Sequence, residues 1–447
     1  MPDSDHKENS PRASSEKRPR IPAMLRALRH PNFQLFFSGQ LISLIGTWMD
    51  NIAEAWLVYR LTGSSLLLGT VAFAGQIPVF LLAPLGGMAA DRWNRRRIVI
   101  ATQTLSMIQA GMLAALTLSH RVTVWEVVVL AASMGAVNAF DIPARQAFLV
   151  EMVGREDLMN AIALNSSMFN GARVIGPAIA GMLVASIGEG WCFFANSVSY
   201  IAVITGLLLM HVEPLRRAVS KETPFENIVA GFRFVRRTGP IWALMLLIGL
   251  VSFVAVPYSV LMPIFADRIL HGGARGLGIL MGAAGVGALL GALTLAARRG
   301  VHGLGRVVAY AAAGFGFSLI LFSFSRWFPL SVALLIPVGF GVMLQMSSSN
   351  TLIQAMVPDH LRGRAMAVYT MMFMGMAPIG ALFAGAMADR IGAPLTVTIG
   401  GFSAILGAAY FYRRLPKLRF EARELLSAQG LLGAEPADRV AAGALWK

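Results

Sequence analysis

Long apolar stretches separated by short polar turns make up most of the chain. Each stretch has the length that an α-helix needs to cross about 30 Å of hydrocarbon. The pattern therefore predicts an all-α membrane protein with twelve transmembrane helices, at residues 33–58, 66–89, 98–118, 124–142, 161–187, 191–212, 241–265, 276–297, 307–324, 328–352, 365–388 and 393–412.

The longest polar gap predicts how these helices are grouped. Residues 213–240 form a basic segment that divides the chain into two bundles of six helices, residues 31–212 and 241–412. Residues 145–181 and 350–385 resemble each other, since both combine Met-Val, a charged turn and a small residue before proline. Parallel six-helix repeats predict a transporter with a cavity between its halves.

The two ends of the chain are polar. Residues 1–30 have no apolar core of a signal peptide, so we expect a disordered cytoplasmic arm, within which residues 21–29 form a basic amphipathic turn. Residues 413–447 are expected to form a cytoplasmic tail.

Composition and charge agree with a membrane protein. Of 447 residues, 56% are hydrophobic and 14% charged, whereas soluble domains carry about 25% charged residues. The net charge of +15 does not indicate nucleic-acid binding, because lysine and arginine fall in the tails and in every second loop. Cytoplasmic loops of membrane proteins are rich in these residues, so both termini are expected in the cytoplasm. The other loops contain only Arg60, Arg121, Arg268, Arg275, Arg326 and Arg390.

Several kinds of site are not expected. Cys192 is the single cysteine, which excludes an intramolecular disulfide and a multi-cysteine metal site. The sequence has no phosphate-binding loop and no catalytic motif, so neither an enzyme nor a nucleotide-driven pump is predicted. We expect no cofactor and no metal, and a monomer whose partners are lipid, a small-molecule substrate and protons.

A charged turn lies between the second and third predicted helices. Residues 86–97 read GGMAADRWNRRR, and a bilayer core cannot hold such a cluster. The spacing of glycine, aspartate and arginine resembles the loop signature of the major facilitator superfamily, with Asn94 where that family often has glycine. The matching residues are Gly87, Asp91, Arg92, Arg95 and Arg96.

Other stretches resemble one branch of that superfamily. RHPNFQLFFSGQLISLIGTWM (29–49), WLVYRLTGSS (56–65) and FDIPARQAF (140–148) are similar to the enterobactin-exporter-like group, which includes bacterial macrolide-efflux proteins. The resemblance implies a bacterial inner-membrane exporter that works by alternating access and is driven by proton entry. The group leads us to expect uncharged residues around Asp50 and Glu54, and this chain departs from it there.

The fifth helix contains ARVIGPAIAG at residues 172–181. Gly176, Pro177 and Gly181 resemble the helix-5 motif of antiporters in the superfamily, which favours export. The alternative interpretation is a packing kink, because an internal proline removes a backbone hydrogen bond and small residues allow close helix approach.

Asp50 and Glu54 are the candidate proton carriers. They lie four residues apart and so on one face of the first helix. Two carboxylates at this spacing cannot both ionise cheaply in a low dielectric, so one is expected to hold a proton near neutral pH. Two alternatives stay open: both residues face outer water, or they pair with Arg173 of helix 5. Arg173 itself is interpreted as a structural partner or as a contact for an anionic substrate.

The remaining polar residues suggest a gate and a cavity. Pro143 is expected to end helix 4, which would place Asp141 and Arg145 beside Asp91 and Arg92 in a cytoplasmic charge network that latches the halves. The cavity candidates, each also explained by a helix–helix hydrogen bond, are Gln40, Asn51, Gln76, Asn138, Asn165, Arg173, Gln345 and Asn350.

The sequence thus predicts a proton-coupled exporter of a small amphiphilic molecule such as a siderophore or drug. Protonation of Asp50 or Glu54 from the outer side would be coupled to rocking of the two halves. A lipid or lysophospholipid flippase is a second interpretation and predicts lateral openings. A non-transporting membrane sensor is a third, and it requires a structured partner-binding tail.

Overall fold

The computed structural model describes residues 23–211, 224–298 and 300–428. The first half of this part contains η1 (Ala23–Arg29), α1 (Pro31–Thr62), α2 (Ser65–Arg92), α3 (Arg95–Leu118), α4 (Val124–Val153), α5 (Leu158–Ile187) and α6 (Glu189–Leu209). The predicted basic linker contains a further helix, α7 (Pro224–Arg237).

The second half begins with one long irregular helix made of α8 (Gly239–Leu250), η2 (Val251–Ala255), η3 (Val256–Leu261), α9 (Met262–Ile264) and η4 (Phe265–Ile269). It continues with α10 (Gly273–Ala296), α11 (Leu304–Phe324), α12 (Phe328–Met356), α13 (Asp359–Thr370), η5 (Met371–Gly375), α14 (Met376–Ile391) and α15 (Ala393–Ala428). Turns of π-helix at η2, η4 and η5 interrupt the first and fifth long helices of this half.

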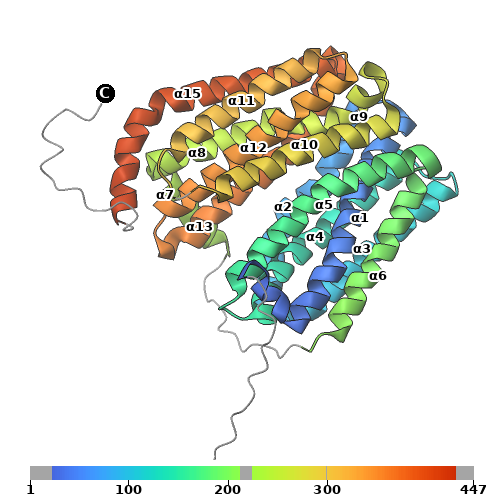
Figure 1. The fold of residues 1–447 in the computed structure, drawn as a ribbon, viewed down its shortest axis with the longest axis horizontal. Helices are drawn as coiled ribbons and strands as arrows, with labels where there is room; N and C mark the ends of the chain where they lie inside the picture. Colours follow the sequence, from blue (N-terminus) through green and yellow to red (C-terminus); the bar gives the residue numbers. More distant parts are fainter. Residues whose placement is uncertain (1–22, 212–223, 299, 429–447) are drawn as a thin grey trace, which may run out of the picture.

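The predicted all-α fold with twelve long helices is confirmed. In the described part of the chain, eleven helices are long and apolar enough to cross a membrane. The twelfth is α1, which has 32 residues but is less hydrophobic because it contains polar groups such as Asp50, Asn51 and Glu54. Figure 1 shows the two halves side by side, with α5 and α10 running along each other where the halves meet.

Glycines allow the same helix pairs to approach closely in both halves. In the first half, a Cβ on Gly135 of α4 would lie 2.3 Å from the carbonyl oxygen of Gly75 on α2. In the second half, a Cβ on Gly339 of α12 would lie 1.8 Å from the carbonyl oxygen of Ala284 on α10. Small residues at such crossings let helix backbones touch, so both halves repeat one packing arrangement.

The helix-breaking role predicted for Pro143 is wrong, since α4 continues through this residue to Val153. Proline removes the hydrogen bond that the carbonyl of Ala139 would otherwise accept. Gly86 of α2 lies against that carbonyl, and a Cβ on Gly86 would come within 1.9 Å of its oxygen. A neighbouring helix covers the freed group, which is how membrane helices tolerate internal proline.

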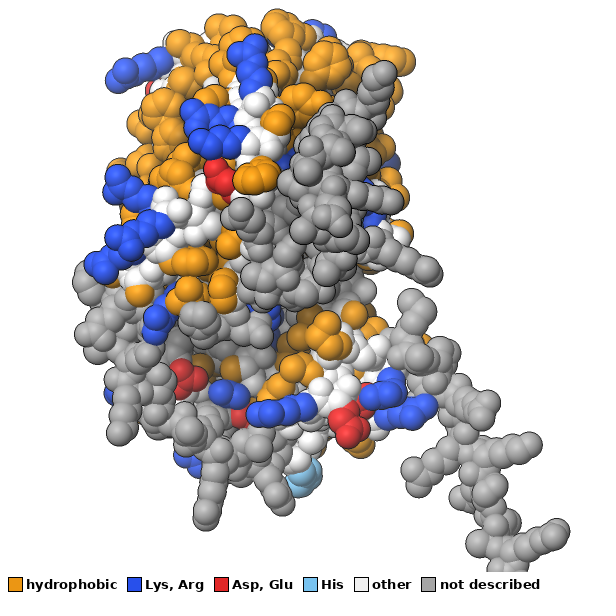
Figure 2. Space-filling model, turned by 90° about the vertical axis from the view of Figure 1, so that its left-hand side faces the viewer, with side chains coloured by type: hydrophobic (Ala, Val, Ile, Leu, Met, Phe, Trp, Pro, Cys, Tyr) orange, Lys and Arg blue, Asp and Glu red, His pale blue; other side chains and the backbone are white. Residues whose placement is uncertain are grey.

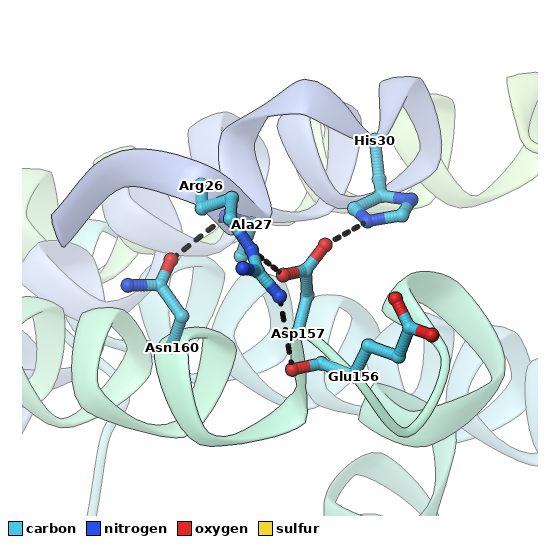
Figure 3. A network of polar contacts seen from close by, with 6 residues as sticks. All are labelled: Arg26, Ala27, His30, Glu156, Asp157 and Asn160. Atoms are coloured by element: carbon cyan, nitrogen blue, oxygen red, sulfur yellow. Dashed lines mark hydrogen bonds and ion pairs between the residues drawn. The ribbon is translucent and has the colours of Figure 1, made fainter. Parts of the chain in front are cut away.

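The N-terminal arm is also more ordered than predicted over residues 23–30, whereas residues 1–22 lie outside the described part. Asp157, just before α5, accepts hydrogen bonds from Arg26 and from His30, the latter at 2.8 Å (Figure 3). The backbone N–H of Ala27 donates to Asn160 Oδ1 at 2.7 Å, and Ala27 is buried. These contacts fasten η1 to the start of α5.

Candidate functional site

Asp50 lies inside the first half, on the face of α1 that packs against α6. Its side chain is only 8% exposed. The Asn196 side chain on α6 lies close enough to hydrogen-bond with this carboxyl group, and Oδ1 has no partner among the described residues. Gly46, one turn earlier, makes room for Asn196, because a Cβ there would lie 2.6 Å from Asn196 Oδ1. The structure therefore places a buried and incompletely satisfied carboxyl group on α1.

A buried tyrosine extends this polar group toward a second carboxylate. Tyr200 of α6 is 2% exposed and lies within reach of the side chains of Thr47 and Asn196. It lies close enough to both Asp50 and Asp141 for their charges to act on it. One buried phenol thus lies between two carboxylates of the first half. Asn196 and Tyr200 were not predicted as site residues, and their only sequence signal is a polar group within an apolar helix.

Glu54 follows Asp50 by one turn of α1, as the spacing predicts. It is half-buried and lies close enough for its charge to interact with that of Asp50. The alternative in which both carboxylates face outer water does not hold for Asp50, which is buried. The alternative of an ion pair with Arg173 is not found among the described residues.

Arg173 instead lies where the two halves meet. Its guanidinium is 5.6 Å from the centre of the Trp48 ring on α1, and Tyr258 of the second half lies nearby. Gly285 of α10 packs against its backbone, since a Cβ there would lie 2.9 Å from the Arg173 carbonyl oxygen. Arg173 therefore contacts α1 of its own half and α10 of the other half.

Asp141 and Arg145 of the predicted gate form a pair, and no contact described for this pair involves Asp91 or Arg92. Asp141 is 3% exposed and forms an ion pair with Arg145 at 3.3 Å. Its Oδ1 accepts hydrogen bonds from Thr102 at 2.8 Å and from Gln103 at 3.0 Å, both on α3. Thr102 and Gln103 were not predicted, because only the tertiary packing of α3 on α4 brings them to Asp141.

The arginines of the charged turn hold α2 and α3 to other helices of the same half. Arg95 donates to the Ala147 carbonyl at 2.9 Å and pairs with Glu151 at 3.1 Å, while Asp91 is exposed and 3.9 Å from Arg95. Arg96 donates to the last carbonyls of α6, at Leu207 and Leu208. In this conformation the contacts described for the turn lie within the first half, so a latch between the halves stays a prediction for another state.

Gly87, the glycine that the loop signature predicts, is not the residue of α2 that packs against α4. Gly87 has open space around its Cα on the side where a Cβ would stand. Gly86, its neighbour, is the residue in contact with α4 at Ala139.

The predicted cavity residues do not form one cluster among the described residues. Gln40 and Gln345 are buried, whereas Asn51 and Gln76 are exposed. Within the described ranges, both amide atoms of Gln345 lack a hydrogen-bond partner, as does Ser348 Oγ one turn further along α12. The remaining candidates are half-buried: Asn138, Asn165, Asn350 and Arg173.

The halves are joined at the end of the molecule that holds the α1–α2 turn, which we call the seam end. There Tyr59 donates to Asp267 Oδ2 at 2.7 Å, and Arg268 donates to the Gly63 carbonyl at 3.1 Å. The opposite end, which holds the charged turn at residues 92–97, we call the basic end. Figure 2 views the left-hand side of Figure 1 and shows many lysine and arginine side chains there.

The helix-5 motif forms part of this seam. A Cβ on Gly278 of α10 would lie 2.5 Å from the Pro177 carbonyl oxygen and 2.7 Å from the Gly181 Cα. Gly176 packs on α1, with Trp48 Cβ 2.5 Å from where its own Cβ would stand. A second contact of this kind joins α2 to α14, where a Cβ on Gly69 would lie 2.5 Å from the Ala381 carbonyl oxygen.

Comparisons with known proteins agree with this architecture. A family model described as transmembrane secretion effector matches residues 23–436. The staphyloferrin A transporter of Staphylococcus aureus is 26% identical, over 87% of this chain and 98% of its own length. The multidrug efflux pump Tap of Mycolicibacterium fortuitum is 29% identical, over 89% and 98%. The enterobactin exporter EntS of Shigella boydii is 25% identical, over 87% and 93%.

Solved structures share the fold at low sequence identity. A POT family transporter in complex with 5-aminolevulinic acid matches with a TM-score of 0.71 and 12% identity, over 87% of this chain and 97% of that one. At this identity the likeness concerns the fold alone.

Proposed function

The chain belongs to the transmembrane secretion effector family of major facilitator transporters and is not an enzyme, and from this premise we propose that it exports a small amphiphilic molecule across a bacterial inner membrane in exchange for protons. Both termini and the basic end face the cytoplasm in this proposal, because most lysines and arginines lie on that side. Relatives named for staphyloferrin A, enterobactin and drug efflux support a siderophore or drug as the substrate.

The buried Asp50 carboxyl is the observation that carries proton coupling. An unpaired charge at this depth is unfavourable by roughly 3 kcal/mol or more on insertion scales. The one neutral group within hydrogen-bonding reach that is described for Asp50 is Asn196, and no cation is paired with Asp50 among the described residues. The carboxyl group is therefore expected to bind a proton in this conformation and to release it when water reaches α1.

Movement of the halves would provide that access. In the present conformation the two halves are fastened at the seam end by Tyr59 and Arg268 and by the contact between Gly181 and Gly278. Substrate and protons would then exchange from the cytoplasmic side. Rocking about the midplane would break these contacts and open the other side, as alternating access requires.

The test uses inside-out vesicles with a respiratory proton gradient that is followed by a pH-sensitive dye. Siderophores and drugs are added in turn, and a substrate of an antiporter should partly collapse the gradient and restore the dye signal. Asp50→Asn should abolish this recovery, since the amide cannot release a proton. Glu54→Gln tests the second carboxylate, and Asp389→Asn, at an exposed carboxylate of α14, is the matched control.

The possible outcomes separate the parts of the proposal. Recovery that survives both Asp50→Asn and Glu54→Gln would keep antiport but move the coupling site, with Asp141 as the next candidate. Vesicles that accumulate labelled substrate without any dye recovery would show transport without proton exchange. Movement of labelled phospholipid in place of drugs would favour a flippase.

A further inference from the structure

A cavity of about 470 Å³ lies at the basic end of the second half, away from the seam and from Asp50. It is bounded by the start of α8, the turn before α11, the end of α12 and the last turns of α15. Most of its wall is apolar, with Leu244, Met356 and Leu415 among the lining side chains.

The polar part of the wall is cationic. Arg306 of α11 and Arg419 of α15 both line the cavity, together with His302. The two guanidinium charges lie close enough to repel each other, and neither group has a hydrogen bond or ion pair within the described residues. Glu421, the nearest acidic residue along α15, lies against Gly239 at the start of α8 and does not line the cavity.

The surroundings resemble the boundary between lipid tails and headgroups. One turn from Arg306, the Tyr310 hydroxyl lies 3.3 Å from that of Tyr412 on α15, and both rings are exposed. Tyrosine and tryptophan gather at this depth of a bilayer, and arginines placed there attract anionic lipid headgroups. Figure 2 shows this side of the molecule, with lysine and arginine side chains set among hydrophobic ones.

We propose that this cavity binds one anionic phospholipid from the adjacent leaflet, with its phosphate between Arg306 and Arg419 and part of an acyl chain against Leu244, Met356 and Leu415. A phosphate neutralises two guanidinium groups that otherwise repel each other, and it forms charge-assisted hydrogen bonds with them. An acyl chain that lies against the apolar wall is removed from water, which favours binding. A free anion has no hydrocarbon to bury and does not gain this contribution. The lipid would bridge α11 and α15, and so hold the end of α15 on the second half.

The experiment measures lipid retention by native mass spectrometry on the full-length protein after delipidation in a neutral detergent. Phosphatidylglycerol and phosphatidylcholine with the same acyl chains are added at equal low ratios. We expect one phosphatidylglycerol to stay bound and to be preferred over phosphatidylcholine. In Arg306→Gln/Arg419→Gln its retention should weaken about thirty-fold, as expected for the loss of two interfacial cations.

Lys417→Gln is the matched control, because Lys417 is an exposed cation of the same helix that does not line the cavity. It should leave retention unchanged, and Ala422→Phe, which narrows the cavity, should weaken it. A general surface attraction would instead make Lys417→Gln as harmful as the double variant and would overturn the proposal. Equal retention of both lipids, or displacement by millimolar inorganic phosphate alone, would overturn it as well.

Discussion

At the scale of single residues, the Asp50 site depends on the partner that α6 supplies. Asn196 lies within hydrogen-bonding reach of Asp50 and of Tyr200, and it fits only because Gly46 has no side chain. An amide can donate to a carboxylate and equally accept from a carboxylic acid, so Asn196 can serve both protonation states of Asp50.

We therefore predict that Asn196→Leu lowers stability by about 1–3 kcal/mol, because it leaves a buried carboxyl without its partner. The thermal unfolding midpoint of the purified protein measures the effect. In an Asp50→Leu background the same substitution should have a smaller effect, with a coupling of about 0.5–3 kcal/mol. Fully additive effects of the two substitutions would show that the hydrogen bond does not stabilise the fold.

At the scale of helices, two internal prolines are accommodated in the same way. Pro143 frees the Ala139 carbonyl, against which Gly86 packs, and Pro177 frees the Arg173 carbonyl, against which Gly285 packs. Each glycine lets a neighbouring helix cover a backbone oxygen that has lost its helical partner. The prolines thus mark helix contacts within the first half and between the halves.

The two adjacent glycines of α2 test this packing. Gly86→Ala should lower stability by about 1–3 kcal/mol, since its Cβ would come within 1.9 Å of the Ala139 oxygen. Gly87→Ala is the control and should be neutral or slightly stabilising, because nothing lies within 4 Å of its Cβ position. Thermal unfolding of both variants gives the comparison, and equal effects would contradict the close approach of α2 and α4.

The η1 segment provides a prediction about pH. Hydrogen bonds from His30 and Arg26 hold the pKa of Asp157 below its ordinary value of 3.8. A lowered pKa in the folded state stabilises the attachment of η1 above that ordinary value, and the stabilisation is lost as pH falls through the lowered pKa. Hydrogen exchange at residues 23–30 should therefore accelerate only in strong acid.

Asp157→Asn should produce the same acceleration at neutral pH, because the amide cannot pair with the Arg26 charge. Glu156→Gln is a suitable control, since only the backbone carbonyl of Glu156 contacts η1 (Figure 3). Unchanged exchange in Asp157→Asn would mean that packing of Ala27, and not the ion pair, fastens the segment.

At the scale of the whole molecule, the seam between the halves is expected to control which side is open. Gly278→Ala should disfavour the present conformation, because its Cβ would lie 2.5 Å from the Pro177 oxygen. Gly282→Ala on the same helix is the control, with its nearest neighbour at an ordinary 3.7 Å. Spin labels at Ser119 and Trp327, exposed residues of the two halves, should show longer distances in Gly278→Ala only.

Much of the architecture follows from the order of residues alone. A helix in hydrocarbon must satisfy its own backbone hydrogen bonds, so length and apolar composition locate most of the twelve helices, although polar groups make α1 less apolar than the others. The charged turn and the first-half motifs likewise indicate the transporter family, and the comparisons confirm it. The spacing of Asp50 and Glu54 correctly placed them one turn apart, because that relation is local to one helix.

Tertiary structure decided what each of those residues touches. Whether Asp50 faces water, Arg173 or Asn196 depends on the rotation of α1 against α5 and α6, and apolar composition around a helix does not fix that rotation. The same holds for the choice of Gly86 over Gly87 and for the passage of α4 through Pro143. Sequence sets the period of a helix and its fit to the bilayer, while contacts between helices depend on a packing energy that involves residues far apart in the chain.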